Sequence, residues 1–131
     1  FNFELRISCP KGFEPDESLL SQNSKQVNLI NDPILAVKGT DLVVTDVWAS
    51  MGQETEQKKR ASAFKNFQVT SELMSYANQN AVFMHCLPAH RGEEVSCDVI
   101  DAHDSIVWDE AENRMHSQKA LLEFLISRFK P

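Results

Sequence analysis

A-V-F-M-H-C-L-P, residues 81–88, is an apolar run that ends abruptly in a histidine, a cysteine and a proline. A short apolar run with a breaker at its end is typical of a strand buried on both faces of a sheet. Pro88 cannot donate to a strand ladder, so we expect the strand to cover residues 81–86. In open parallel sheets, ligands bind beyond the carboxyl ends of the strands. His85 and Cys86 therefore stand where such a sheet would hold a site.

Three other segments share this form, an apolar or alternating run that stops at a proline or a polar cluster. They predict strands at residues 3–8, 41–45 and 105–108. The clusters that follow the last two strands contain Asp46 and Arg114. If the sheet is parallel, the carboxyl ends of these strands share one edge with that of the central strand.

Helical segments are expected between the strands, at residues 17–24, 33–38, 54–64, 71–78, 93–101 and 112–129. Asp16, Asp32 and Thr70 are suited to cap the first, second and fourth of them. Strands that alternate with helices predict βαβ units with right-handed crossovers. The fold class is therefore α/β, with three layers and an open parallel sheet flanked by helices, as in Rossmann-like domains.

The composition limits the class of protein. A chain of 131 residues corresponds to one domain. Its 13 basic and 19 acidic residues, a net charge of −6, argue against a nucleic-acid partner. No apolar run approaches the ~20 residues of a membrane span, so no membrane partner is expected. Three irregularly spaced cysteines and no signal peptide favour free thiols and a cytoplasmic location, and the first residue, Phe1, indicates a fragment or processed chain.

The residues after the strands offer an acid and a cation. Asp46 could hold an ammonium group, or simply cap the end of its strand. Arg114 lies early in a predicted helix, where the dipole disfavours a cation, so an anionic or carbonyl partner is expected. The plainer alternative is a surface pair with Glu110 or Glu112. Together with the thiol and imidazole, these groups suit a small zwitterionic substrate.

Cys86 and its neighbours allow several interpretations. Adjacent residues of a strand point to opposite faces, so His85 and Cys86 are not expected to form a direct catalytic pair. Cys86 could be a nucleophile, a base, a polar contact or a small buried apolar side chain, and a nearby cation would raise its thiolate fraction. A zinc site built from Cys86, His90 and Cys97 lacks the usual ligand spacings.

Three motifs, in order, resemble those of ornithine carbamoyltransferases. They are D-V-W-A-S-M-G at residues 46–52, H-C-L-P at residues 85–88 and E-A-E-N-R at residues 110–114. A-H-R-G-E-E-V, at residues 89–95, resembles the microbial form of the family. The S-M-G triplet favours ornithine over the aspartate or putrescine of related transferases.

The resemblance implies a transferase of arginine biosynthesis or the urea cycle. It would convert carbamoyl phosphate and L-ornithine to citrulline and phosphate, with no metal or organic cofactor. The neutral δ-amine of ornithine would attack the carbamoyl carbon directly, so the rate should rise with pH toward the pKa of the bound amine. Catalysis would then consist of positioning and charge stabilisation.

The resemblance also implies roles for individual residues. Asp46 would bind the ornithine α-amino group, and Ser50 and Met51 would belong to a loop that closes over ornithine.

Three further residues would serve the reacting groups. Cys86 would contact the δ-amine and the carbamoyl group, the Leu87 carbonyl would contact the carbamoyl nitrogen, and Arg114 would polarise the carbamoyl oxygen. A cis peptide bond is implied between Leu87 and Pro88.

Other family motifs are absent from the chain. The phosphate-binding S-T-R-T and H-P-x-Q motifs and the ornithine-binding D-G-x-N-N turn do not occur. Residues 1–131 therefore resemble only the ornithine-binding domain, without its first βα unit, and the chain alone is expected to be inactive. The expected partners are the missing amino-terminal domain and further copies, in a trimer or multiple of trimers. The alternatives are a stand-alone amino-acid-binding or regulatory domain and a hydrolase that uses Cys86 as nucleophile.

Overall fold

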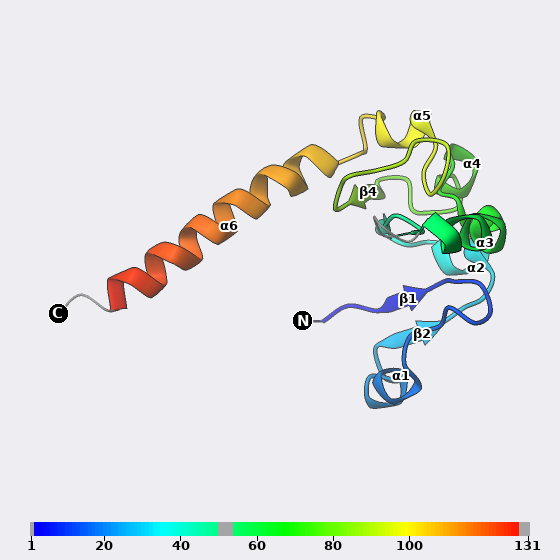
Figure 1. Ribbon diagram of the computed structural model, residues 1–131, viewed down its shortest axis with the longest axis horizontal. Coiled ribbons are helices and arrows are strands. Elements are labelled where there is room, and N and C mark those ends of the chain that lie inside the picture. The colour runs from blue at the N-terminus through cyan, green and yellow to red at the C-terminus, as the bar shows by residue number, and fades with distance from the viewer. Residues whose placement is uncertain (1, 50–53, 129–131) are drawn as a thin grey trace.

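Four short strands form two parallel pairs in the part of the chain that the computed structural model describes, residues 2–49 and 54–128 (Figure 1). Strand β1 (Leu5–Ile7) pairs with β2 (Val27–Leu29), and β3 (Leu42–Thr45) pairs with β4 (Val82–His85). The predicted parallel α/β arrangement is confirmed, but the pairs do not join into one sheet. A cavity of about 500 Å³ lies along β1 and the start of β3.

The helices follow the strands in the predicted alternation. They are α1 (Glu17–Gln22), α2 (Pro33–Val37), α3 (Glu54–Phe64), α4 (Ser71–Met74), α5 (Cys97–Ile100) and α6 (Val107–Arg128), with a 3₁₀ turn η1 (Lys65–Phe67).

Local capping explains where three of these helices begin. The side chains of Asp16, Asp32 and Thr70 each accept a backbone N–H of the first turn, as the sequence predicted. Helices α4 and α5 are shorter than predicted. For α5 the reason is a tight return of the preceding loop, in which the N–H of Gly92 donates to the carbonyl of Val95 at 2.8 Å.

The predicted strand at residues 105–108 is wrong. Only Ser105 pairs with β4, through a parallel bridge to Phe83, and Ile106 donates its N–H to the Phe83 carbonyl at 3.0 Å. Helix α6 begins at Val107, ahead of the predicted start at residue 112. Val107 is fully buried, so the apolar run marks the entry of a helix into the core.

The core is small and surrounds β4. Phe83, 1% exposed, is its largest apolar side chain. The side chains that pack together come from β3, β4, α4, α5, the start of α6 and two loop positions: Val43, Val69, Leu73, Phe83, Val95, Val99, Ile100 and Val107.

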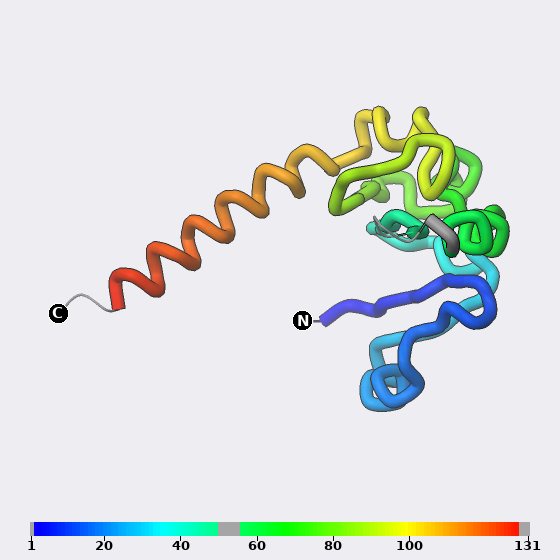
Figure 2. Tube along the Cα trace, in the orientation of Figure 1, coloured from blue at the N-terminus to red at the C-terminus, as the bar shows by residue number. Residues whose placement is uncertain are grey.

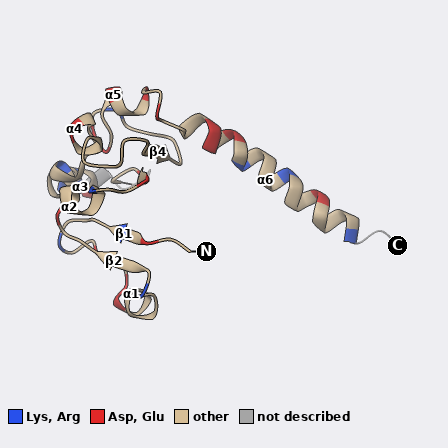
Figure 3. Cartoon of the chain, turned by 180° about the vertical axis from the view of Figure 1, so that it is seen from behind, with Lys and Arg blue, Asp and Glu red and all other residues tan. Residues whose placement is uncertain are grey.

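Helix α6 leaves this core and projects away from the other elements (Figures 1 and 2). Apolar side chains along the helix are uncovered, with Met115 59%, Leu122 60% and Ile126 65% exposed. Charged residues are interspersed along it (Figure 3). Within the described residues, no helix has the length and apolar character needed to cross a membrane.

Truncation of the central core side chain tests this description. We expect Phe83→Ala to lower the free energy of unfolding by about 3–5 kcal/mol, because it removes a fully buried aromatic ring and leaves a cavity. Phe3→Ala, at a position 60% exposed, is the matched control and should lower the free energy of unfolding much less. Urea denaturation measures both, and equal losses would contradict the proposed core.

Candidate functional site

The register of β3 and β4 brings Asp46 and Cys86 together. Thr45 lies opposite His85 at the ends of the two strands, so the next residues emerge side by side. The Cys86 thiol donates a hydrogen bond to Oδ1 of Asp46 at 3.2 Å. Oδ1 also accepts the N–H of Val47 at 2.7 Å. The predicted meeting of the two strand ends is therefore confirmed.

The surroundings of Cys86 keep its thiol protonated. Desolvation of the sulfur raises the pKa of Cys86, and the hydrogen bond to Asp46 and the charge of that carboxylate raise it further. A cation would have had the opposite effect. The geometry therefore favours a polar contact over a nucleophile for Cys86.

Cys86 and Arg114 line one cavity. It has a volume of about 410 Å³ and lies between the end of β4 and the first turns of α6, with Met84 and Asn113 also in its wall. Arg114 is exposed and makes no ion pair with any side chain in the described part of the chain. The alternative of a surface pair with Glu110 or Glu112 is wrong, because no ion pair joins Arg114 to either residue, and Glu112 lies 3.2 Å from His116.

Glu110 also lines this cavity, although the sequence analysis considered it only as a possible surface partner of Arg114. Its Oε2 atom is buried and has no hydrogen-bond partner among the described residues. The spacing offered a signal, because Glu110 and Arg114 are four residues apart and so share one face of a helix. The cavity thus holds a carboxylate and a guanidinium that the rest of the described structure leaves unpaired.

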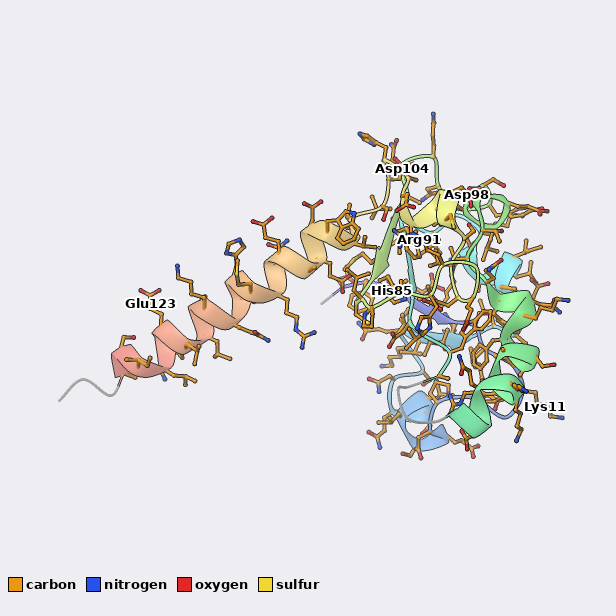
Figure 4. All side chains as sticks on the ribbon, turned by 45° about the horizontal axis from the view of Figure 1, so that its top comes forward. Lys11, His85, Arg91, Asp98, Asp104 and Glu123 are labelled. Carbon is orange, nitrogen blue, oxygen red and sulfur yellow. The ribbon has the colours of Figure 1, made fainter. Side chains whose placement is uncertain are left out.

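His85 does not line this cavity and lies among the other side chains of the domain (Figure 4). It is fully buried while Cys86 is exposed, so the prediction of opposite faces is confirmed. Its Nε2 atom lies 3.1 Å from Oε1 of Glu94, which is also fully buried. This pairing was not predicted, because residues 93–101 were expected to form an acidic helical segment.

Leu87 has an unusual backbone conformation. Its φ is 53°, and the peptide bond to Pro88 is cis, as the resemblance implied. The side chain packs against the core while the backbone turns out of β4.

Two expected ligand-binding residues, Ser50 and Met51, lie outside the described residues. The segment that leads to them is fixed to α3. The ring of Trp48 stacks on that of Phe64, with centroids 6.0 Å apart, and Nη1 of Arg60 donates to the Trp48 carbonyl at 3.3 Å.

Possible metal ligands are grouped differently from the zinc set considered above. Among residues 2–49 and 54–128, potential ligand atoms of Asp46, His85 and Cys86 lie within 4.8 Å of one another, whereas Cys86, His90 and Cys97 form no such group. His85 fits a metal poorly, because Leu87 donates to its Nδ1 and its Nε2 faces Glu94.

Comparison with known proteins gives a consistent result. The family model described as aspartate/ornithine carbamoyltransferase, Asp/Orn binding domain, matches residues 1–125. The chain is 58% identical over 128 residues to the ornithine carbamoyltransferase of Hydrogenovibrio crunogenus, covering 98% of this chain and 42% of that protein. It is 59% identical over 126 residues to that of Methylococcus capsulatus, covering 96% and 42%.

Solved structures agree. The ornithine carbamoyltransferase from Pyrococcus furiosus matches with a TM-score of 0.83 and 50% identity, over 92% of this chain and 41% of that one. The anabolic enzyme from Campylobacter jejuni matches with a TM-score of 0.86 and 37% identity, over 96% and 44%. The chain thus spans about two fifths of the length of its relatives.

The contact between Asp46 and Cys86 can be tested by alkylation. We expect Asp46→Asn to increase the rate at which iodoacetamide modifies Cys86 at pH 8, because the loss of the carboxylate charge lowers the pKa of the thiol. Mass spectrometry resolves the sites, and the exposed Cys97 serves as an internal reference. A Cys86 rate that is unchanged relative to Cys97 would contradict the contact.

Proposed function

The chain belongs to the aspartate/ornithine carbamoyltransferase family, as its Asp/Orn binding domain, and on this premise we propose that it is the ornithine-binding half of an ornithine carbamoyltransferase. The complete enzyme would transfer the carbamoyl group of carbamoyl phosphate to the δ-amine of L-ornithine, giving citrulline and phosphate. The observation that supports this most directly is the position of Cys86. Its thiol donates a hydrogen bond to Asp46, and the residue lines one cavity with Arg114.

The charges suit the two ends of the reaction. The Asp46 carboxylate would hold the α-ammonium of ornithine, and Ser50 and Met51 would close over the amino acid. Arg114, unpaired in the described structure, would bind the carbamoyl oxygen and stabilise the negative charge that develops there.

The loop after β4 would serve the reacting nitrogen atoms. The Leu87 carbonyl would accept a hydrogen bond from the carbamoyl nitrogen, and the Cys86 thiol would contact the δ-amine. The neutral amine attacks the carbamoyl carbon, the bond from that carbon to the phosphate oxygen breaks, and the amine passes a proton to the departing phosphate. The raised pKa of Cys86 agrees with a thiol that stays protonated and forms no covalent intermediate.

The part of a full-length relative that residues 1–131 do not match would complete the fold. The cavity of about 500 Å³ along β1 and β3 would be filled by a further βα unit, which would join the two strand pairs into one open, three-layer sheet. The amino-terminal domain would cover the exposed apolar residues of α6, such as Leu122. We propose that the assembled enzyme is a cytoplasmic trimer, or a multiple of trimers, in arginine biosynthesis.

A chimera tests the function. We expect residues 1–131, fused behind the amino-terminal part of the Hydrogenovibrio crunogenus enzyme, to form citrulline from carbamoyl phosphate and ornithine, whereas the chain alone forms none, because only the fusion supplies both substrate sites. A colorimetric citrulline assay measures this. An inactive chimera, together with saturable ornithine binding by the chain alone, would instead indicate a stand-alone binding domain.

Substitutions in the chimera separate the two charge roles. We expect Asp46→Ala to raise the KM for ornithine by about 100-fold, since it removes a charge-assisted contact of the substrate. Arg114→Gln should lower kcat by about 100- to 1000-fold, since it removes charge stabilisation at the carbamoyl oxygen.

Steady-state kinetics against both substrates measures the two effects. Lys119→Gln, on the exposed surface of the same helix α6, is the control and should leave both constants unchanged. If Asp46→Ala binds ornithine or norvaline as well as the parent, the role given to Asp46 fails.

A further inference from the structure

The loop after β4 is pinned from inside by two fully buried polar side chains. His85 and Glu94 are each 0% exposed, and Nε2 of His85 lies 3.1 Å from Oε1 of Glu94. The same oxygen accepts the backbone N–H of His90 at 2.6 Å. One buried carboxylate thus ties the end of the strand to the returning limb of the loop.

The loop backbone determines which ring nitrogen of His85 holds the proton. The N–H of Leu87 donates to Nδ1 of His85 at 2.9 Å, so Nδ1 is an acceptor. Nε2 therefore holds the proton and donates to Glu94. Both ring nitrogens are engaged, and the Cys86 thiol donates its hydrogen bond to Asp46. The imidazole has no free position from which to exchange a proton with the thiol.

The conformation of Leu87 needs this support. Its φ of 53° lies in the left-handed region, which a leucine occupies only where its surroundings fix it. The hydrogen bond from its N–H to His85 and the packing of its side chain against the core provide that restraint. A change in this φ would rotate the Leu87 carbonyl.

We propose that His85 and Glu94 are positioning residues, which fix the left-handed conformation of Leu87 and thereby direct the Leu87 carbonyl and the Cys86 thiol toward the substrate. This inference rests on the proposed function, which assigns the two groups their contacts with the carbamoyl group and the amine. It excludes His85 as the general base, because its Nδ1 accepts the N–H of Leu87 and its Nε2 proton is held by Glu94.

Two substitutions of His85 in the chimera separate its two hydrogen bonds. In His85→Asn the amide oxygen takes the place of Nδ1 and still accepts from Leu87, whereas in His85→Gln the amide nitrogen takes the place of Nε2 and still donates to Glu94. We expect His85→Gln to lower kcat by about 100-fold, as for a misplacement of about 1 Å, and His85→Asn by at most about tenfold.

The matched pair at position 94 tests the anchor. Glu94→Gln keeps an acceptor oxygen for His85 and His90 and should retain kcat within about threefold, with an unchanged pH profile. Glu94→Ala removes the acceptor and should lower kcat by about 100-fold. A proton relay would instead make both His85 variants equally inactive and shift the pH profile of Glu94→Gln. If these residues served stability alone, kcat across the His85 and Glu94 variants would decrease in step with the unfolding temperature, whichever hydrogen bond a variant keeps. Either result overturns the proposal.

The ¹⁵N chemical shifts of the His85 ring test the geometry without reference to turnover. We expect a neutral ring with its proton on Nε2, measured in the chimera by long-range ¹H–¹⁵N correlation and assigned by comparison with His85→Asn. If this tautomer is found in a chimera that makes no citrulline, the proposed carbamoyl transfer is contradicted, whereas the proposal that His85 and Glu94 fix the conformation of Leu87 is retained. A proton on Nδ1 overturns the positioning proposal whatever the activity.

Discussion

The parallel register in which Thr45 of β3 lies opposite His85 of β4 is the constraint on which the site depends. Both strands end at the same level, so Asp46 and Cys86 lie side by side, and the Cys86 thiol donates a hydrogen bond to Oδ1 of Asp46 at 3.2 Å. Because side chains alternate along a strand, a slip of one residue would bury Cys86 and expose His85. The register therefore sets both the open site on one face and the buried support on the other.

The site holds side chains of opposite charge on either side of Cys86 in its contacts, Asp46 through a hydrogen bond and Arg114 through a shared cavity. A carboxylate stands beside the thiol of Cys86 and raises its pKa, so that the sulfur remains a neutral contact. Arg114 lines the same cavity as Cys86 and has no ion-pair partner in the part of the chain that the structure describes. This arrangement is suited to a molecule with an ammonium group at one end and a polarised carbonyl at the other, and it needs no nucleophile from the protein.

The same domain leaves surfaces that a compact protein of this size would normally bury. The two strand pairs are separate, with a cavity along β1 and β3, and the apolar residues of α6 are exposed. Both features agree with a chain that spans about two fifths of its relatives. The first turns of α6, which contain Glu110 and Arg114, line a cavity together with Met84 of β4, whereas the later part of the helix carries the exposed apolar residues.

The sequence by itself determined the parallel α/β class, the strands β1, β3 and β4, the caps at Asp16, Asp32 and Thr70, and the meeting of Asp46 with Cys86. Hydrophobic period, cap chemistry and strand ends are local signals. It could not distinguish a strand from a helix start at residues 105–108, since a short apolar run reports burial rather than conformation. Only the tertiary structure decided that Arg114 has no ion-pair partner among the described residues and that Glu94 lies against His85. Those outcomes depend on how a loop and a helix pack against β4. This packing, and not the adjacent residues in the sequence, decides which partner a charged side chain meets.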